Sequence, residues 1–451
     1  MKVLLTVHQF LPDYSSGTEI LTLSTARQLR EFGHEVVIFT GHPAKYDYDD
    51  DHRFDNYLYD DFMVYRFNHA HVPMGGQKNV VEIEYNNKLV AKEFRKIVRS
   101  VKPDVVHFFH LGRLSGSLID TCLELSVPTV YTPTDFWFIC PTCQLRKFDD
   151  SACLGPDRFS TNCLLHIVHQ NQPKAIYDKV KILPKSVLSL FVAACHLGMF
   201  KHTWYGPLVQ AMYRRRAFLR QRLSFLNKVL APTKLMQNLL VENGMPKSKI
   251  QYCPFGIEFE ESTLKDDNKD EHSNTLRIGF IGTLYQHKGA HILVQAIKNL
   301  DKRDLELKIY GKMNDFPDYV EKLLKIAEGD ERISFLGTFP NSQINEIFAG
   351  IDVLVVPSVW YENTPLVIYS AQACRCPVIA TDLGGMSEVI RHGHNGLLFK
   401  KGDVSALSAL IRRLIDEKDL LKQLQSNSII PKTSEMYAKE ISNVYQLLIK
   451  R

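Results

Sequence analysis

The sequence lacks a long uninterrupted apolar run. Its most apolar stretch, residues 187–200, is broken by Ser189, His196 and Gly198, and it is shorter than the ~20 residues that a membrane-spanning helix needs. The first ten residues, MKVLLTVHQF, also lack the apolar segment and small-residue cleavage site of a secretory signal and are typical of a first strand. We therefore expect a cytoplasmic protein.

Several common ligand-binding patterns are also missing. The glycines of RIGFIGTLYQHKG do not have the G-x-G-x-x-G spacing of a dinucleotide-binding loop. Asp47 and Asp49 form a D-x-D pair, but no buried strand precedes them, so a solvated acidic loop is the better interpretation. The sequence shows no internal repeat and no pattern specific to nucleic acid, so we expect no nucleic-acid partner.

What is present is the composition of a globular protein with more than one core. The 451 residues exceed the usual domain size of roughly 100–200 residues. Short β-branched runs alternate with helical patterns in both halves, which predicts an α/β fold of two Rossmann-like domains, each with a parallel sheet covered by helices. We expect an N-terminal domain over residues 1–260, a C-terminal domain over 275–430, a last helix over 431–451 and a polar hinge within 255–276.

The expected strands alternate with helices in each half. They span residues 2–8, 35–40, 104–109, 129–132 and 229–232 in the first half and 277–281, 307–310, 333–336, 353–357 and 377–380 in the second. The first expected helix spans 17–32.

Positive charge is concentrated in one segment. The net charge is only +5, yet residues 174–228 hold eleven lysines and arginines and one acid. We expect a helical basic insertion over about 172–225 in the N-terminal domain. It could attract anionic lipid or a phosphorylated ligand, or it could be a solvated helix face.

Two loops after expected strands could hold an anion. Ser15, Ser16 and Gly17 precede a helix and would let backbone amides approach a ligand, although Ser16 could simply cap that helix. In the second half, Lys288 lies beside a helix start, where it could offset charge on a departing diphosphate. A plain surface lysine is the alternative.

The segment 353–390 is the most informative. A buried strand ends at Pro357, a loop carries Glu362 and Asn363, and Pro365 begins a helix. The amides that follow would face the crevice at the carboxyl ends of the strands, where open α/β sheets bind ligands.

Histidines and cysteines form two further candidate groups. His107 and His110 lie at the end of an expected strand, where they could orient a hydroxyl or could be hydrogen-bonded core residues. The spacing C-x-x-C-x9-C-x9-C, with His166 and His169 close behind, fits a structural zinc site or a set of reduced, buried cysteines. The cysteines concerned are Cys140, Cys143, Cys153 and Cys163.

Taken in order, these segments resemble the family 4, or group 1, glycosyltransferases of the GT-B fold. The motifs that carry the resemblance are P-x-x-x-x-G-x-E (12–19), KPDVVH (102–107), TPTDFWFICP (132–141), LAPTKLM (230–236), PFGIE (254–258), GTLYQHKG (282–289), LGTF (336–339), ENTP (362–365), PVIAT (377–381) and NGLLF (395–399).

The resemblance implies a retaining hexosyltransferase that takes a nucleoside diphosphate sugar as donor and needs no metal for catalysis. The implied acceptor is a glycan, as in lipid-linked precursors of cell-surface polysaccharide or lipopolysaccharide. From the basic insertion we also expect a peripheral position at the inner face of the plasma membrane. In the GT-B arrangement the last helix crosses back to the N-terminal domain.

Site residues carried over from the family fall into three groups. Glu362, Lys288 and Asp135 would be catalytic, while His107, His110 and Thr134 would lie on the acceptor or sugar side. The donor would also be bound by Gly17, Gly282, Thr283, Asn363, Thr364, Pro365, Leu366 and Ser370.

Three positions depart from the family pattern. Ser370 replaces the second of two glutamates, Thr283 replaces an arginine, and Thr134 replaces the histidine of a His-Asp pair. These departures keep open the alternative of a non-catalytic GT-B scaffold or regulator of glycan assembly. A second alternative is a GT-B relative with another activity, a nucleotide-sugar epimerase.

Overall fold

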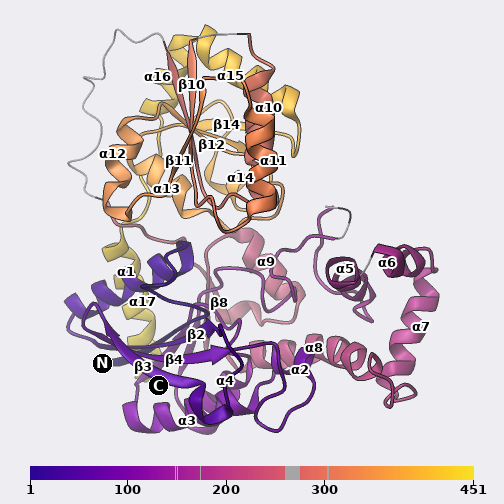
Figure 1. Ribbon diagram of the computed structural model, residues 1–451. Coiled ribbons are helices and arrows are strands. Elements are labelled where there is room, and N and C mark those ends of the chain that lie inside the picture. The colour runs from indigo at the N-terminus through magenta and orange to yellow at the C-terminus, as the bar shows by residue number, and fades with distance from the viewer. Residues whose placement is uncertain (148, 150, 173, 260–274, 302–303, 451) are drawn as a thin grey trace. The chain divides into compact units, whose positions relative to one another are not determined.

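A computed structural model describes residues 1–147, 149, 151–172, 174–259, 275–301 and 304–450 (Figure 1). The chain divides into two compact units, which are unit 1 (Met1–Pro254 and Ser434–Arg451) and unit 2 (Phe255–Thr433). Most of the expected hinge, residues 260–274, lies outside the described residues. Each unit contains its own sheet.

Unit 1 contains an eight-stranded sheet in the order β3-β4-β2-β1-β5-β6-β7-β8. All neighbouring strands are parallel except β3 and β4, which form a hairpin. The strands are β1 (Lys2–Val7), β2 (Glu35–Pro43), β3 (Phe54–Tyr59), β4 (Phe62–His69), β5 (Val105–Phe108), β6 (Thr129–Tyr131), β7 (Lys228–Ala231) and β8 (Ile250–Tyr252).

Unit 1 also contains ten α-helices among its described residues. These are α1 (Gly17–Glu31), α2 (Val80–Ile83), α3 (Lys88–Val101), α4 (Ser117–Glu124), α5 (Thr161–Asn171), α6 (Lys174–Lys181), α7 (Lys185–His196), α8 (Gly206–Phe225), α9 (Lys234–Glu242) and α17 (Ser434–Ile449). Helix α3 shows why they form: the Asn87 side chain caps its first turn, accepting from Val90 N, and Lys102 ends it in the left-handed region.

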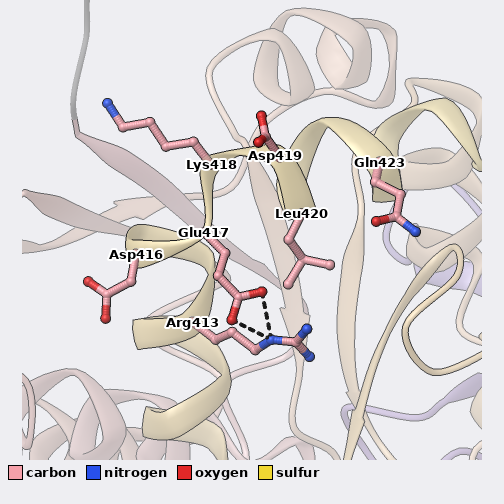
Figure 2. A pocket seen from close by; sticks show the side chains of 7 residues that line it. All are labelled: Arg413, Asp416, Glu417, Lys418, Asp419, Leu420 and Gln423. Atoms are coloured by element: carbon pink, nitrogen blue, oxygen red, sulfur yellow. Dashed lines mark hydrogen bonds and ion pairs between the residues drawn. The ribbon is translucent and has the colours of Figure 1, made fainter.

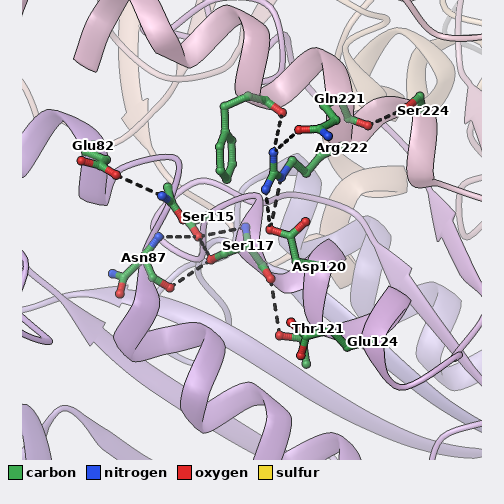
Figure 3. A network of polar contacts seen from close by, with 12 residues as sticks. Glu82, Asn87, Ser115, Ser117, Asp120, Thr121, Glu124, Gln221, Arg222 and Ser224 are labelled. Carbon is green, nitrogen blue, oxygen red and sulfur yellow. Dashed lines mark hydrogen bonds and ion pairs between the residues drawn. The ribbon is translucent and has the colours of Figure 1, made fainter. Parts of the chain in front are cut away.

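A polar network joins α8 to the body of unit 1 (Figure 3). Arg222 of α8 donates from Nη2 to Oδ2 of Asp120 on α4 at 2.9 Å. Next to this pair, Ser115 Oγ accepts from Asn87 N at 3.0 Å, and Ser117 Oγ donates to Asn87 O at 2.9 Å. The network therefore fixes the start of α3, the start of α4 and the end of α8 against one another.

Helix α17 completes unit 1 from the far end of the chain. It packs on α1 (Figure 1), and its side chains of Tyr437, Ala438, Ile441 and Tyr445 are fully or almost fully buried. Among the described residues, no helix combines the length and the apolar character that crossing a membrane requires.

Unit 2 contains six parallel strands in the order β11-β10-β9-β12-β13-β14. They are β9 (Leu276–Ile281), β10 (Leu305–Tyr310), β11 (Ile333–Gly337), β12 (Val353–Val356), β13 (Val378–Thr381) and β14 (Gly396–Phe399). Its helices are α10 (Ala290–Lys298), α11 (Pro317–Ala327), α12 (Ile344–Ala349), α13 (Leu366–Ala373), α14 (Met386–Val389), α15 (Val404–Asp416) and α16 (Lys418–Ser426). The prediction of two parallel, Rossmann-like sheets is confirmed.

Candidate functional site

Each sheet reverses its strand order at one point, and a candidate site lies there in each unit. In unit 2 the reversal falls between β9 and β12, because β10 and β11 follow on one side and β13 and β14 on the other. Open α/β sheets bind ligands at the carboxyl ends of the strands at such a point. The segments that leave β9 and β12 here carry Lys288 and Glu362.

The Lys288 and Glu362 side chains meet directly. Lys288 Nζ donates to Glu362 Oε1 at 2.6 Å, and the same oxygen accepts from Trp360 Nε1 at 2.7 Å and from Ser358 Oγ at 2.9 Å. All three donors approach Oε1, so among the described residues none occupies Oε2. The carboxylate is thus held in one orientation with an oxygen left for a further donor.

Electrostatics keep this carboxylate ionised. Burial raises the pKa of Glu362, but the Lys288 charge and the hydrogen bonds from Lys288, Trp360 and Ser358 outweigh burial and lower the pKa below its ordinary value. Lys288 also lies 5.3 Å from the centre of the Trp360 ring, within the range of a cation–π contact. The site therefore presents one fixed negative and one fixed positive group.

A glycine brings Lys288 close to β12. Gly289 has φ of +75°, and a Cβ there would come within 2.0 Å of Pro357 O. Only glycine fits this approach without a shift of the backbone. On the other side, Gly385 N donates to Glu362 O at 2.9 Å, so the glycine pair after β13 supports the Glu362 loop.

The remaining donor candidates differ in position. Asn363 and Thr364 are buried, and Pro365 precedes α13, whose first amides can face an anion. Ser370 donates from Oγ to Leu366 O at 3.3 Å, so its hydroxyl is engaged with its own helix. Gly282 is half-buried and Thr283 is exposed at the end of β9.

In unit 1 the strand order reverses between β1 and β5. His8 follows β1 and His110 follows β5, and their ring centres lie 4.1 Å apart. Burial, with smaller contributions from the neighbouring His110 and Arg113, lowers the pKa of His8 well below its ordinary value. His8 was missed in the sequence, although a histidine directly after the first strand is a signal that could have found it.

The hydrogen bonds of His110 fix its tautomer. Nδ1 accepts from Gly112 N at 2.8 Å, so the ring hydrogen lies on Nε2, which donates to Asp135 Oδ2 at 2.6 Å. Asp135 Oδ1 accepts from Trp137 N at 2.9 Å. Burial raises the pKa of Asp135, but His110 and the other donors lower it below its ordinary value. His110 thus orients Asp135 and has no free nitrogen of its own.

The start of α1 adds a buried acid that was missed as a site residue. Glu19 is fully buried, both of its carboxylate oxygens lack a hydrogen bond of good geometry, and Oε1 lies 3.6 Å from His8 Nε2. Burial raises its pKa. Ser16 makes no side-chain cap and Gly17 is exposed, so the first amides of α1 are not capped by a side chain.

His107 is a hydrogen-bonded core residue, which is one of the two alternatives that the sequence left open. It is fully buried, Nδ1 lies 2.6 Å from Tyr445 Oη, and Nε2 lies 2.9 Å from Thr132 Oγ1. Both nitrogens are therefore occupied, and the expectation that His107 faces an acceptor is corrected. Thr134 donates from Oγ1 to Phe109 O at 3.1 Å.

The four predicted zinc ligands do not form one group. Cys143 has φ of +62° and its thiol lies with His110 and Asp135. Cys140, Cys153, Cys163 and His166 instead line a cavity of about 20 Å³. Among the described residues the four thiols are not all within metal-ligand reach of one another, so the structure does not bring the predicted ligands together and the zinc site stays a prediction.

A separate hollow of about 630 Å³ lies between α15 and α16 (Figure 2). Its lining residues are exposed apart from Leu420 and charged apart from Leu420 and Gln423. Arg413 Nε donates to both carboxylate oxygens of Glu417 at 2.9 and 3.0 Å. The hollow contains neither Lys288 nor Glu362, and it is a surface depression rather than part of the candidate site.

Two family models match the chain. Residues 15–148 match Glycosyltransferase Family 4, and residues 275–417 match Glycosyl transferases group 1. Over 205 residues the chain is 31% identical to the amylovoran biosynthesis glycosyltransferase AmsK of Erwinia amylovora. This match covers 43% of this chain and 49% of the relative. A D-inositol 3-phosphate glycosyltransferase of Pseudarthrobacter chlorophenolicus is 32% identical over 172 residues, 36% of this chain and 40% of the relative. The matches thus span about half or less of these relatives.

Solved structures match over the whole length. HepE of Anabaena, in complex with UDP and glucose, has a TM-score of 0.65 at 17% identity and covers 99% of both chains. Sucrose-phosphate synthase of Thermosynechococcus elongatus has a TM-score of 0.67 at 14% identity and covers 100% of this chain and 99% of its own. At these identities the likeness shows a shared fold.

Proposed function

Because the chain belongs to the group 1, or family 4, glycosyltransferases and has their GT-B fold, we propose that it transfers a hexose-like sugar from a nucleoside diphosphate sugar to a glycan. The observation that carries the proposal is the contact of Lys288 with Glu362 at the strand reversal of unit 2. The glycan is proposed to be a lipid-linked precursor of cell-surface polysaccharide or lipopolysaccharide.

The proposed chemistry follows from these two charges. As the bond between the sugar and the diphosphate breaks, negative charge develops on the leaving oxygen, and Lys288 together with the first amides of α13 stabilises it. Glu362 accepts hydrogen bonds from sugar hydroxyls through Oε2. The acceptor oxygen bonds to the same face of the sugar, its proton passes to the departing diphosphate, and configuration is retained.

The acceptor is proposed to bind at the strand reversal of unit 1. Asp135, oriented by His110, would accept a hydrogen bond from an acceptor hydroxyl. Its low pKa makes it a weak base, which suits a positioning role, since the departing diphosphate takes the proton.

The donor site is tested by calorimetric titration with a panel of nucleoside diphosphates and their sugars. We expect the parent to bind nucleotides of one base only. Lys288→Ala should weaken the binding of both the nucleoside diphosphate and its sugar nucleotide at least tenfold, about 1.4 kcal/mol. Glu362→Gln should weaken the binding of the sugar nucleotide only. Lys322→Ala is the matched control, because Lys322 is an exposed lysine elsewhere in unit 2.

Two results would replace the proposal. If no nucleotide binds, the chain is a non-catalytic scaffold, as Ser370, Thr283 and Thr134 allow. If incubation with donor alone changes the sugar without an acceptor, the activity is that of an epimerase.

Attachment to an anionic membrane surface is proposed through α6, α7 and the turn that follows, which project from the body of unit 1 (Figure 1). Large apolar side chains are exposed there, and Lys179, Lys185 and Lys201 are exposed among them. Exposed apolar residues combined with lysines suit a helix that lies on anionic lipid. The apolar residues are Ile176, Ile182, Leu183, Val187, Leu190, Leu197, Met199 and Trp204.

The arginines of α8 contribute less to the exposed positive charge than the sequence suggests. Arg215 is buried and donates to Trp137 O, and Arg216 donates to Asp157 O at 3.2 Å. A change of these residues would therefore disturb the fold, and α7 is the better target.

We expect Leu190→Glu with Leu197→Glu to abolish co-sedimentation with vesicles that contain phosphatidylglycerol. Leu58→Glu, at an exposed leucine on β3, should leave it unchanged. Equal sedimentation of parent and double variant would refute attachment through this surface.

A further inference from the structure

Two histidines and a glutamate converge beside the last residue of β4. His69 ends this strand and His71 lies two residues further on, and Glu84 follows α2. Glu84 Oε1 lies 3.0 Å from His69 Nε2 and 2.9 Å from His71 Nδ1. All three ligand atoms lie within 4.8 Å of one another. Neither the proposed donor site nor the proposed acceptor site uses this group.

The contacts are not those of an ordinary hydrogen-bonded triad. Nε2 of His69 and Oε1 of Glu84 are both buried, and neither makes a hydrogen bond of acceptable geometry despite their short separation. The His69 side chain is only 3% exposed, whereas that of His71 is 80% exposed. Three polar atoms therefore point to one place that is closed on the protein side and open to solvent on the other.

From these contacts we infer that His69, His71 and Glu84 bind a divalent transition-metal ion, for which Zn²⁺ is the representative. Two imidazoles and one carboxylate are a ligand set that zinc commonly takes, with a fourth position left for water or another ligand. Bonds of about 2.1 Å in a tetrahedral site place ligand atoms roughly 3.4 Å apart. The two separations from Glu84 Oε1 would need to open by about half an ångström, and the two histidine nitrogens already lie within 4.8 Å of each other.

The surrounding backbone holds these ligands in place. Met74 and Gln77 bridge across the turn between them, and Gln77 Nε2 donates to Asn86 O at 2.8 Å. Tyr85, next to Glu84, is buried and donates from Oη to Ala211 O at 3.0 Å. The backbone around the ligands is therefore fixed, and binding of an ion would mainly order the exposed His71 side chain.

The nearby charges act in both directions. The Glu84 carboxylate supplies a negatively charged ligand atom beside the two histidine nitrogens. Arg113 is close enough to act on both His71 and Glu84, and its charge opposes a cation. A strong transition-metal ligand set can overcome this repulsion, whereas a weakly held alkali ion would not bind.

The test uses the full-length chain freed of metal with a chelator and titrated with ZnCl₂ in a calorimeter. We expect saturable binding of one ion, and a Co²⁺ complex with the strong visible absorption of a four-coordinate site. His71→Ala and Glu84→Gln should each weaken binding at least tenfold. His202→Ala, an exposed histidine elsewhere in unit 1, should bind as the parent does.

His71 is the decisive position because its exposed side chain can be removed without loss of the fold. Circular dichroism of the two site variants checks that they are folded. No saturable binding by the parent, or equal binding by His71→Ala, would overturn the proposal and leave the three residues as an ion-paired cluster only.

Discussion

At the scale of single residues, unit 1 contains two neighbouring groups whose charged forms burial disfavours. Glu19 has a raised pKa and His8 a lowered one, and the two side chains lie 3.6 Å apart. An ionised carboxylate without good hydrogen bonds is costly in such surroundings. The start of α1 is therefore a place where charge is suppressed.

Because its pKa is raised, Glu19 makes the stability of the parent depend on pH, and Glu19→Gln removes this dependence. The folded protein holds the Glu19 proton more tightly than the unfolded chain does, so stability falls as pH rises from the ordinary glutamate pKa through the raised one. The variant lacks this loss. We expect its thermal unfolding midpoint to exceed that of the parent at pH 7.5, with a smaller difference at pH 4.5.

Glu388→Gln, on the partly exposed α14 of unit 2, is the control and should show no comparable trend. A constant difference between Glu19→Gln and the parent across this range would contradict a raised pKa for Glu19.

At the scale of elements, the close approach of the Lys288 loop to the end of β12 depends on Gly289. We expect Gly289→Ala to lower both stability and nucleotide affinity, because the new Cβ would displace the backbone that holds Lys288. The positive φ alone costs roughly 1–2 kcal/mol, and overpacking adds roughly 1–3 kcal/mol. Chemical denaturation and nucleotide titration measure the two effects.

Gly393→Ala separates strain from collision. Gly393 has φ of +74°, but a Cβ there would meet nothing within 4 Å. Gly393→Ala should therefore lose only the roughly 1–2 kcal/mol of stability that positive φ costs, and it should keep the nucleotide affinity of the parent. Similar losses in both variants would show that conformational strain alone accounts for the effect.

Some strands of the two sheets could be predicted from the sequence and others could not. The central parallel strands were predictable because both of their faces are buried, which gives continuous β-branched runs. The hairpin of β3 and β4 was not predicted, because β3 is an edge strand with exposed and half-buried residues. Its turn residues Asp60 and Asp61 both have positive φ. The sequence did not indicate this turn, because the two residues lie in a generally acidic region.

The candidate sites were predictable to different degrees. Lys288 and Glu362 could be anticipated because they lie in loops after predicted strands, and their 2.6 Å contact needs only the parallel topology. His69, His71 and Glu84 could not, because their meeting depends on the path of the irregular chain between β4 and α3. The direction of the Cys143 thiol likewise depends on a backbone angle that spacing does not reveal.

At the scale of the whole molecule, the chain leaves unit 1, forms all of unit 2 and returns to unit 1 as α17. Removing residues 434–451 should prevent unit 1 from folding. Burial of one large apolar side chain contributes roughly 1.5–3 kcal/mol, so the four buried in α17, namely Tyr437, Ile441, Val444 and Tyr445, approach the total stability of about 5–15 kcal/mol typical of a protein.

Limited proteolysis checks this prediction. Fragments of unit 1 should be digested in the shortened chain and protected in the parent. As a control, Leu447→Ala alters an exposed residue of the same helix and should leave the protection intact. A protected unit 1 in the shortened chain would show that α17 is dispensable.

The return of α17 also sets an order of events on the ribosome. Unit 2 is continuous in sequence and can close while the chain is still being made, whereas unit 1 must wait, although its residues emerge first. Until α17 has been translated, Tyr445 is absent and His107 lacks its partner at the centre of unit 1. A prematurely terminated chain would therefore carry a folded unit 2 and an unfinished unit 1, and nascent unit 1 would expose to chaperones the apolar surface that α17 covers.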